Sequence, residues 1–352
     1  MAEGYGAKRL GATAPLVRAV TPLTPPRTSG TFPRPAPPGD RRVVRHLTRT
    51  TTPELMPLDI AISQFRPVKG DFDATLDACA GIVERALGQE PRPRLLVFPE
   101  TALTGYFLEG GVREQALPAP QLFDRLNARA GPDAAGLDVA IGFYELDAGC
   151  IYNSAMYATL GPGGGIRHVH RKVFLPTYGV FQEERFVEAG PGIEAFDGPL
   201  GRTALLICEE GFHSISGTLA ALGGAAIILI LSASPARGAA PGAGVPGNLA
   251  RWDALASGIA AEHGVFVIVS QLVGFEGGKG FAGGSAAYDP RGDRLVAGPL
   301  WEEALLPVQI DLGEIARART DEPLFADLER SWTRLLVNSP GSGVRRPAAE
   351  LE

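Results

Sequence analysis

Three residues of the sequence could together attack and cleave an amide bond. Glu100 follows the apolar run Leu95-Leu-Val-Phe98 and Pro99, Lys172 stands in Arg171-Lys-Val-Phe-Leu-Pro176, and Cys208 follows the run Thr203-Ala-Leu-Leu-Ile207. A thiol can attack a carbonyl carbon, a carboxyl group can move protons, and an ammonium can stabilise an oxyanion. Each of the three comes at the end of an expected strand, where α/β folds place their ligands.

Glu100 and Lys172 each have an ordinary alternative. If Phe98 and Tyr106 surround the carboxyl group of Glu100, desolvation favours its neutral form, as suits a general acid and base. It could equally be a solvated loop acid. The chain has 33 Lys and Arg residues but only four lysines, Lys8, Lys69, Lys172 and Lys279. A lysine kept among so many arginines suggests a compact point charge, although a surface cation is the simple alternative.

Cys208 is expected where a strand turns sharply into a helix. Such an elbow exposes a nucleophile and directs the following N–H groups at an oxyanion. A neighbouring cation would lower the pKa of the thiol. The alternative is an inert buried cysteine, which suits Cys79 better because Cys79 falls within an expected helix.

Together the three motifs resemble the nitrilase (carbon-nitrogen hydrolase) superfamily. They are Pro-Glu-x-x-x-x-Gly-Tyr106, Arg-Lys172-x-x-Leu-Pro and a strand followed by Cys208-Glu-Glu, and the likeness extends over residues 58–334. The segments Leu175-Pro-Thr-Tyr-Gly-Val-Phe-Gln-Glu-Glu-Arg-Phe186 and Ser232-Ala-Ser-Pro235 are most similar to the glutaminase-like domain of NAD synthetases and its stand-alone relatives. No synthetase half follows, so channelling of ammonia cannot be inferred.

The resemblance implies a mechanism. Glu100 would take the proton of Cys208, and Lys172 with the N–H of Glu209 would stabilise the oxyanion on the way to a thioester. Ammonia or an amine would leave, water would release a carboxylic acid, and no metal or organic cofactor would be needed. Glu183 matches a second glutamate of the family, with Glu184 as the fallback.

The resemblance also bears on the pocket, the fold and the assembly. The aromatic residues expected to wall the acyl pocket, unless they are ordinary core residues, are Tyr106, Tyr178 and Phe181. The fold implied is α/β (α+β), a four-layer αββα sandwich that forms homodimers or higher homo-oligomers. Cys208-Glu-Glu replaces the more usual Cys-Glu-Asp or Cys-Tyr-Asp, which leaves the catalytic set intact but the substrate open.

Hydrophobic periodicity predicts a single domain of alternating elements over residues 57–335. Helices are expected at residues 73–87, 216–222 and 248–263. Strands are expected at residues 58–65, 95–98, 139–144, 153–160, 166–170, 203–207, 226–231 and 265–273, with a hairpin at 284–297 and a terminal segment from 308 to 332. The three strands between 139 and 170 should form a meander.

The ends of the chain differ from this domain. Residues 1–55 hold nine prolines and eight arginines, and no apolar stretch of a secretory signal follows. We expect residues 1–56 to be a disordered extension, a transit peptide or sequence upstream of a natural start at Met56, the last being favoured. Residues 336–352 are predicted to be a flexible tail.

Composition limits the partners. The chain has 352 residues, a net charge of −6 and a pI near 5.5, so it has no basic excess for nucleic acid or an anionic membrane. Its longest apolar run, Ala225 to Leu231, is too short to span a bilayer. Three widely spaced cysteines indicate a reducing, cytoplasmic location. A small-molecule amide is the expected substrate.

Other motifs are weaker. His168-x-His170, with Cys208 and His213, could form a zinc site but lacks a fourth assigned ligand. Residues 274–280 lack the first glycine and the Ser or Thr of a phosphate loop and are expected to form a flexible turn, and residues 283–287 fail the serine elbow at Ala287. Two rival functions remain, a nitrilase acting on nitriles and a catalytically silent binding or scaffold protein.

Overall fold

Two sheets packed face to face form the centre of the molecule. The computed structural model describes residues 57–108, 111–238 and 245–338. The predicted extension at residues 1–56 and residues 339–352 of the predicted tail lie outside the described residues. One sheet has the strand order β14-β1-β2-β3-β4-β5 and the other β13-β12-β9-β8-β7-β6, so each has six strands.

The first sheet carries a parallel core and a meander. β1, β2 and β3 are parallel, while β3, β4 and β5 are antiparallel neighbours, as the sequence predicted. The strands are β1 (Leu58–Gln64), β2 (Leu95–Val97), β3 (Asp138–Asp147), β4 (Cys150–Thr159), β5 (Gly165–Arg171) and β14 (Ala304–Ile310).

The second sheet is parallel at its centre, where β7, β8 and β9 lie side by side. These strands are runs of buried aliphatic residues because both of their faces are covered. The strands are β6 (Ala195–Gly198), β7 (Gly201–Ile207), β8 (Ile227–Ser232), β9 (Phe266–Gln271), β12 (Ala286–Tyr288) and β13 (Arg294–Ala297).

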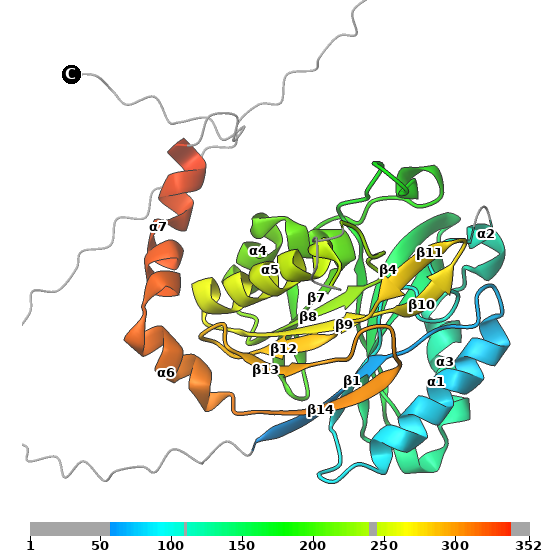
Figure 1. Cartoon of the computed structure of the whole chain (residues 1–352). Helices are drawn as coiled ribbons and strands as arrows, with labels where there is room; N and C mark the ends of the chain where they lie inside the picture. Colours follow the sequence, from blue (N-terminus) through cyan, green and yellow to red (C-terminus); the bar gives the residue numbers. More distant parts are fainter. Residues whose placement is uncertain (1–56, 109–110, 239–244, 339–352) are drawn as a thin grey trace, which may run out of the picture. The chain divides into compact units, whose positions relative to one another are not determined.

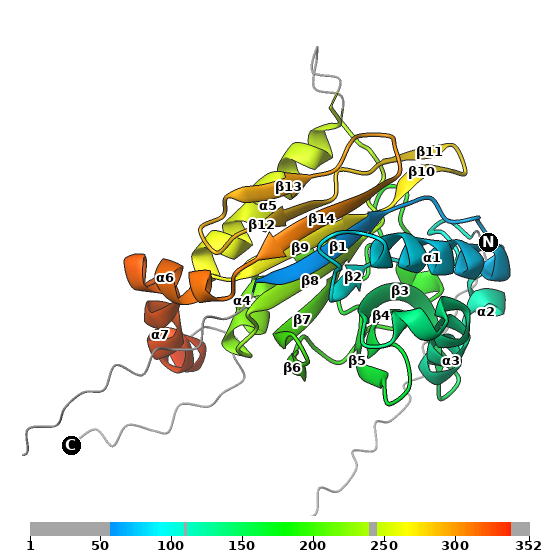
Figure 2. The same cartoon turned by 90° about the horizontal axis from the view of Figure 1, so that it is seen from below.

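Helices cover the outer faces and complete the αββα sandwich (Figures 1 and 2). Helices α1 (Phe72–Leu87) and α3 (Ala119–Ala130) cover the first sheet, and α4 (Ser214–Leu222) and α5 (Gly247–His263) cover the second. The remaining helices are α2 (Val112–Gln115), α6 (Gly313–Asp321) and α7 (Leu324–Asn338), with short 3-10 turns η1 (Pro132–Ala134), η2 (Glu183–Arg185) and η3 (Cys208–Phe212). The predicted α/β sandwich is therefore confirmed.

Alternation along each strand divides the core between the two interlayer spaces. In β1, Ile60 and Ile62 pack between the sheets, whereas Ala61 packs under α1. Because β2, β7 and β8 all run as parallel strands, the residues that follow them can meet at the carboxyl ends of the two sheets.

The sequence misplaced a few elements. It gave no helix at α3, and it extended one strand over residues 265–273. In the structure β9 ends at Gln271, and β10 (Val273–Glu276) leaves the sheet to pair with β11 (Lys279–Ala282). Residues 274–280, expected to form a flexible turn, therefore belong mostly to this hairpin, and only Gly277 and Gly278 form its turn, both with positive φ. None of the described helices is long and apolar enough to cross a membrane.

Candidate active site

Glu100 lies in a loop directly after β2 and is completely buried. Its Oε1 accepts hydrogen bonds from Lys172 Nζ at 2.8 Å and from Asn153 Nδ2 at 2.8 Å, and its Oε2 accepts one from Ala233 N at 2.8 Å. Burial excludes the solvated loop acid, one of the two interpretations that the sequence left open. Three donors from other elements, which the sequence did not predict, hold the carboxyl group in place.

The backbone around Glu100 is tightly packed and strained. Thr101, the next residue, has a φ of 46°, a left-handed conformation that costs a non-glycine residue about 1–2 kcal/mol. A Cβ atom added to Gly142 of the neighbouring strand β3 would lie 2.6 Å from the Cα of Glu100. Gly142 therefore allows β3 to approach closely enough to fix the position of Glu100.

Lys172 follows β5 and is as buried as Glu100. Its Nζ donates to Glu100 Oε1 at 2.8 Å and to Glu183 Oε1 at 2.7 Å. Burial disfavours the charge, but the carboxylates of Glu100 and Glu183 outweigh burial and hold the pKa of this ammonium well above its ordinary value. Lys172 is thus a permanent buried cation, not the surface cation of the alternative interpretation.

Cys208 is the first residue of η3, between β7 and α4, so the predicted elbow is confirmed. Its φ of 45° is again left-handed, and its side chain is buried. Ser232 Oγ, at the end of β8, donates to Cys208 Sγ at 3.5 Å. Glu209, as the second residue of η3, carries one of the N–H groups that have no acceptor within the turn.

The thiol of Cys208 does not have the lowered pKa that the sequence predicted. Burial raises the pKa of the thiol, and the carboxylate of Glu100 raises it further. Lys172 lowers it, as expected of a nearby cation, but does not outweigh these two effects. The charges of Glu100 and Lys172 thus act on the sulfur, while the resting group stays a neutral thiol.

Glu183, not the fallback Glu184, joins this cluster. Glu183 begins η2 and is buried, whereas Glu184 is exposed. The Oε1 of Glu183 accepts from Lys172 Nζ and from the hydroxyl of Tyr106, while its Oε2 is buried without a partner. Burial raises the pKa of Glu183, with the carboxylate of Glu100 acting in the same direction and Lys172 opposing them.

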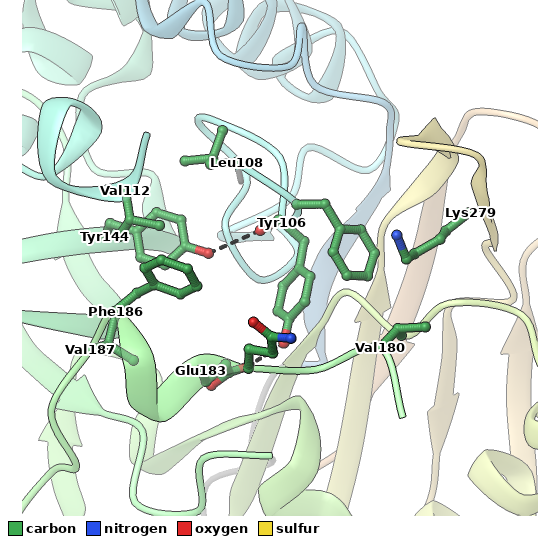
Figure 3. A pocket seen from close by; sticks show the side chains of 11 residues that line it. Tyr106, Leu108, Val112, Tyr144, Val180, Glu183, Phe186, Val187 and Lys279 are labelled. Atoms are coloured by element: carbon green, nitrogen blue, oxygen red, sulfur yellow. Dashed lines mark hydrogen bonds between the residues drawn. The ribbon is translucent and has the colours of Figure 1, made fainter. Parts of the chain in front are cut away.

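The three predicted aromatic residues lie next to one another. The ring of Phe181 is 5.9 Å from that of Tyr106 and 5.5 Å from that of Tyr178. Tyr178 is half-exposed and donates to Glu209 Oε2 at 2.8 Å, next to the nucleophile's turn. Figure 3 shows Tyr106 with its hydroxyl directed at Glu183, in the wall of a cavity of about 210 Å³.

Sequence reasoning missed Glu210, a buried residue that ties two of the candidate residues together. Glu210 Oε2 accepts from Ile207 N at 2.6 Å and lies 2.7 Å from His170 Nε2, and its Oε1 accepts from Val173 N at 2.7 Å. Ile207 precedes Cys208, and Val173 follows Lys172. The only signal was the acid that follows Cys-Glu, noted merely as a departure from the family pattern.

The contacts of Asn153 and Ser232 were also missed, because in sequence both are ordinary polar residues of apolar strands and Ser232 was singled out only as part of the segment Ser232-Ala-Ser-Pro235. In the structure both are completely buried and each bonds to one candidate residue. The two histidines of the weak zinc motif have other contacts: His170 contacts Glu210, and His168 stacks on Phe196. Within the described part of the chain, no three His, Cys, Asp or Glu side chains are grouped to hold a metal ion.

Known proteins with this architecture share the nitrilase fold. A carbon-nitrogen hydrolase from Helicobacter pylori superposes with a TM-score of 0.68 at 23% identity, over 80% of this chain and 99% of that one. The sequence profile of the carbon-nitrogen hydrolase family matches residues 59–320. This chain therefore belongs to the carbon-nitrogen hydrolase family, within the nitrilase superfamily.

Two relatives illustrate the range of the family. The glutamine-dependent NAD(+) synthetase of Thermotoga maritima is 31% identical over 271 residues, which are 76% of this chain but 44% of the synthetase. This chain thus spans less than half the length of that relative. A protein named Nitrilase 2, from an unknown prokaryotic organism, is 27% identical over 74% of this chain and 86% of its own length.

Proposed function

We propose that this hydrolase cleaves the amide bond of a small molecule through a thioester on Cys208. The observation that carries the proposal is the buried cluster in which one ammonium, Lys172, bonds two carboxylates, Glu100 and Glu183, beside a thiol at a strand-end elbow. Few functions other than catalysis would account for two carboxylates, an ammonium and a thiol buried together, because burying charged groups is costly.

In the proposed reaction, Glu100 accepts the proton of the Cys208 thiol as the sulfur attacks the amide carbon. The ammonium of Lys172 and the N–H of Glu209 stabilise the oxyanion. The C–N bond then breaks, and the leaving nitrogen takes the proton from Glu100. Water attacks the thioester while Glu100 accepts its proton, and a carboxylic acid and the free thiol result.

Glu183 has a different part in this proposal. Its Oε1 accepts from both Lys172 and Tyr106, so its part is to position these two groups. It would hold the ammonium of Lys172 at a fixed point between the two carboxylates. The aromatic residues Tyr178 and Phe181 would contact the acyl part of the substrate.

The test is ammonia release from a panel of amides, with glutamine included because glutamine-dependent synthetases are relatives. Cys208→Ala should lower turnover by several orders of magnitude and should lose the acyl adduct that mass spectrometry detects on the parent. Cys150→Ala is the matched control, since Cys150 is a partly exposed cysteine on β4, and it should keep full turnover. Turnover by Cys208→Ala close to that of the parent would refute the proposal.

A nitrile substrate is the second candidate, supported by the match to Nitrilase 2 over most of its length. The same thiol would attack the nitrile carbon, and two waters would be added. Matched amide and nitrile pairs distinguish the two activities by their kcat/KM values. Failure of every amide and nitrile, together with an unmodified Cys208, would favour a silent binding protein.

We further propose that the protein is cytoplasmic and acts as a homodimer or higher homo-oligomer. The exposed apolar residues Leu324 and Leu336 on α7 support self-association, being 53% and 43% exposed. Light scattering after size-exclusion chromatography measures the mass directly, and a monomer at micromolar concentration would contradict the proposal.

A further inference from the structure

The cavity beside Tyr106 has a described lining that does not include the thiol of Cys208. We call it the Tyr106 cavity, and its walls include Tyr106, Tyr144, Val112, Phe186, Val187 and Lys279 (Figure 3). Glu183 also lines it, but Glu100, Lys172 and Cys208 are not among the described residues that do. The hydroxyl of Tyr106 and the carboxylate of Glu183, which bond to each other, thus stand between this cavity and the ammonium of Lys172.

We propose that the Tyr106 cavity binds a small carboxylate that carries one aromatic ring. This site goes beyond the proposed hydrolysis, since neither the thiol nor its proton carrier faces it. The argument rests on the size of the cavity, the chemistry of its walls and the cation at its rim.

The size suits a single ring. The volume is about 210 Å³, and an engineered protein cavity of about 150 Å³ is large enough to hold benzene. A benzene-sized ring with a short carboxylate arm therefore fits, whereas a two-ring ligand would have to extend into solvent.

Away from Gln182, Glu183 and Lys279, which also line the cavity, the walls favour an apolar body. Val112, Phe186 and Val187 are apolar, and the hydroxyls of both tyrosines donate hydrogen bonds within the protein. Tyr144 Oη donates to Tyr106 O at 3.2 Å, and the hydroxyl of Tyr106 donates to Glu183. Both tyrosines therefore offer ring faces and edges to a ligand, and aromatic pairs of this kind contribute about 0.5–1.5 kcal/mol beyond burial.

The rim favours an anion. Lys279 belongs to β11, and its Nζ lies 4.3 Å from the centre of the Phe107 ring. Figure 3 shows Lys279 across Tyr106 from Phe186 and Val187, so a ring held by those residues could direct its carboxylate toward the ammonium. Among the described residues, Lys279 takes part in no ion pair with a carboxylate.

The test measures binding by calorimetry in full-length Cys208→Ala, in which no thioester can form. Phenylacetate is the probe, and 2-phenylethanol, with the same ring and no carboxylate, is the neutral comparison. Val187→Trp and Leu108→Trp each fill the cavity, Lys279→Met removes the cation, and Arg113→Met removes an exposed cation of α2 that does not line the cavity. Circular dichroism confirms that each variant is folded.

We expect phenylacetate to bind, and either filling variant to weaken it more than tenfold. Lys279→Met should weaken it about two- to fivefold, as for a partly exposed ion pair, and should leave 2-phenylethanol unaffected. Arg113→Met should change neither affinity. No binding, or binding that survives both filling variants, overturns the proposal. Because the catalytic thiol is absent throughout, the result is independent of whether the parent hydrolyses any amide.

Discussion

Glu210→Gln is the most informative substitution outside the proposed catalytic residues. The carboxylate of Glu210 accepts from the backbone N–H groups of Ile207 and Val173 through different oxygens, and His170 contacts the same oxygen as Ile207. Glutamine has the same shape but replaces one of these oxygens with an NH₂ group, which cannot accept.

The size of the effect follows from the geometry. If the new NH₂ replaces Oε1, the N–H of Val173 loses its acceptor, and if it replaces Oε2, the N–H of Ile207 does. His170 can adapt by changing tautomer, but the backbone cannot. One buried N–H is therefore left unsatisfied in either orientation, at a cost of about 1–3 kcal/mol. Glu210→Ala leaves both unsatisfied, which doubles the cost to about 2–6 kcal/mol.

Urea-induced unfolding measures this loss. The unfolding midpoint of Glu210→Gln should fall at an unchanged m-value, and turnover should fall as well, since a shift near 1 Å can cost about a hundredfold. Glu209→Gln is the matched control, because among the described residues its side chain accepts a hydrogen bond only from the half-exposed Tyr178, and its other neighbour, the partly exposed His213, lies 3.8 Å from it. Its stability should stay within about 0.5 kcal/mol of the parent. A parent-like midpoint for Glu210→Gln would refute the reasoning.

Three further predictions concern the same region. Tyr106→Phe removes one of two donors to Glu183 and should lower kcat by about tenfold with little change in KM, and a change in KM alone would contradict this. Burial raises the pKa of Glu276, so the folded state binds this proton more tightly than the unfolded state. The free energy of unfolding should therefore fall as pH rises from about 4.3 through the raised pKa. Glu276→Gln, whose side chain can still accept from Tyr106 N, should make this free energy less dependent on pH when unfolding is measured at several pH values. Because the pKa of the Cys208 thiol is raised, the rate of its exchange with a small neutral disulfide reagent should not level off below about pH 8.5, and a plateau at lower pH would show a preformed thiolate.

The sequence predicted those parts of the site that local pattern determines. An apolar run followed by Pro99 and Glu100, and another followed by Cys208, place both residues at strand ends, because apolar runs this short are typical of buried strands. The motif context was also enough to prefer Glu183 to Glu184, which differ in burial but not in chemistry.

The remaining features depend on contacts between distant parts of the chain. Ala233 N reaches Glu100 across 133 positions, and no periodicity indicates that pairing. The predicted lowering of the pKa of the Cys208 thiol was wrong for the same reason. The pattern predicted a nearby cation, but the larger opposing effect is burial, which only the packing of the two sheets determines.

The charge arrangement gives the proposed mechanism a definite order of events. Two carboxylates keep Lys172 charged, so its ammonium is in place before any oxyanion forms. Burial and Glu100 keep the thiol of Cys208 neutral, so the enzyme does not hold a thiolate in the resting state. The proton must then pass to Glu100 as the sulfur bonds to the substrate, because the negative charge that leaves the carboxylate then develops on the substrate oxygen, where the ammonium of Lys172 stabilises it, and does not stay on a buried sulfur. Reactivity would thus be confined to molecules that present a carbonyl oxygen to that ammonium, which protects a buried thiol from unproductive reactions.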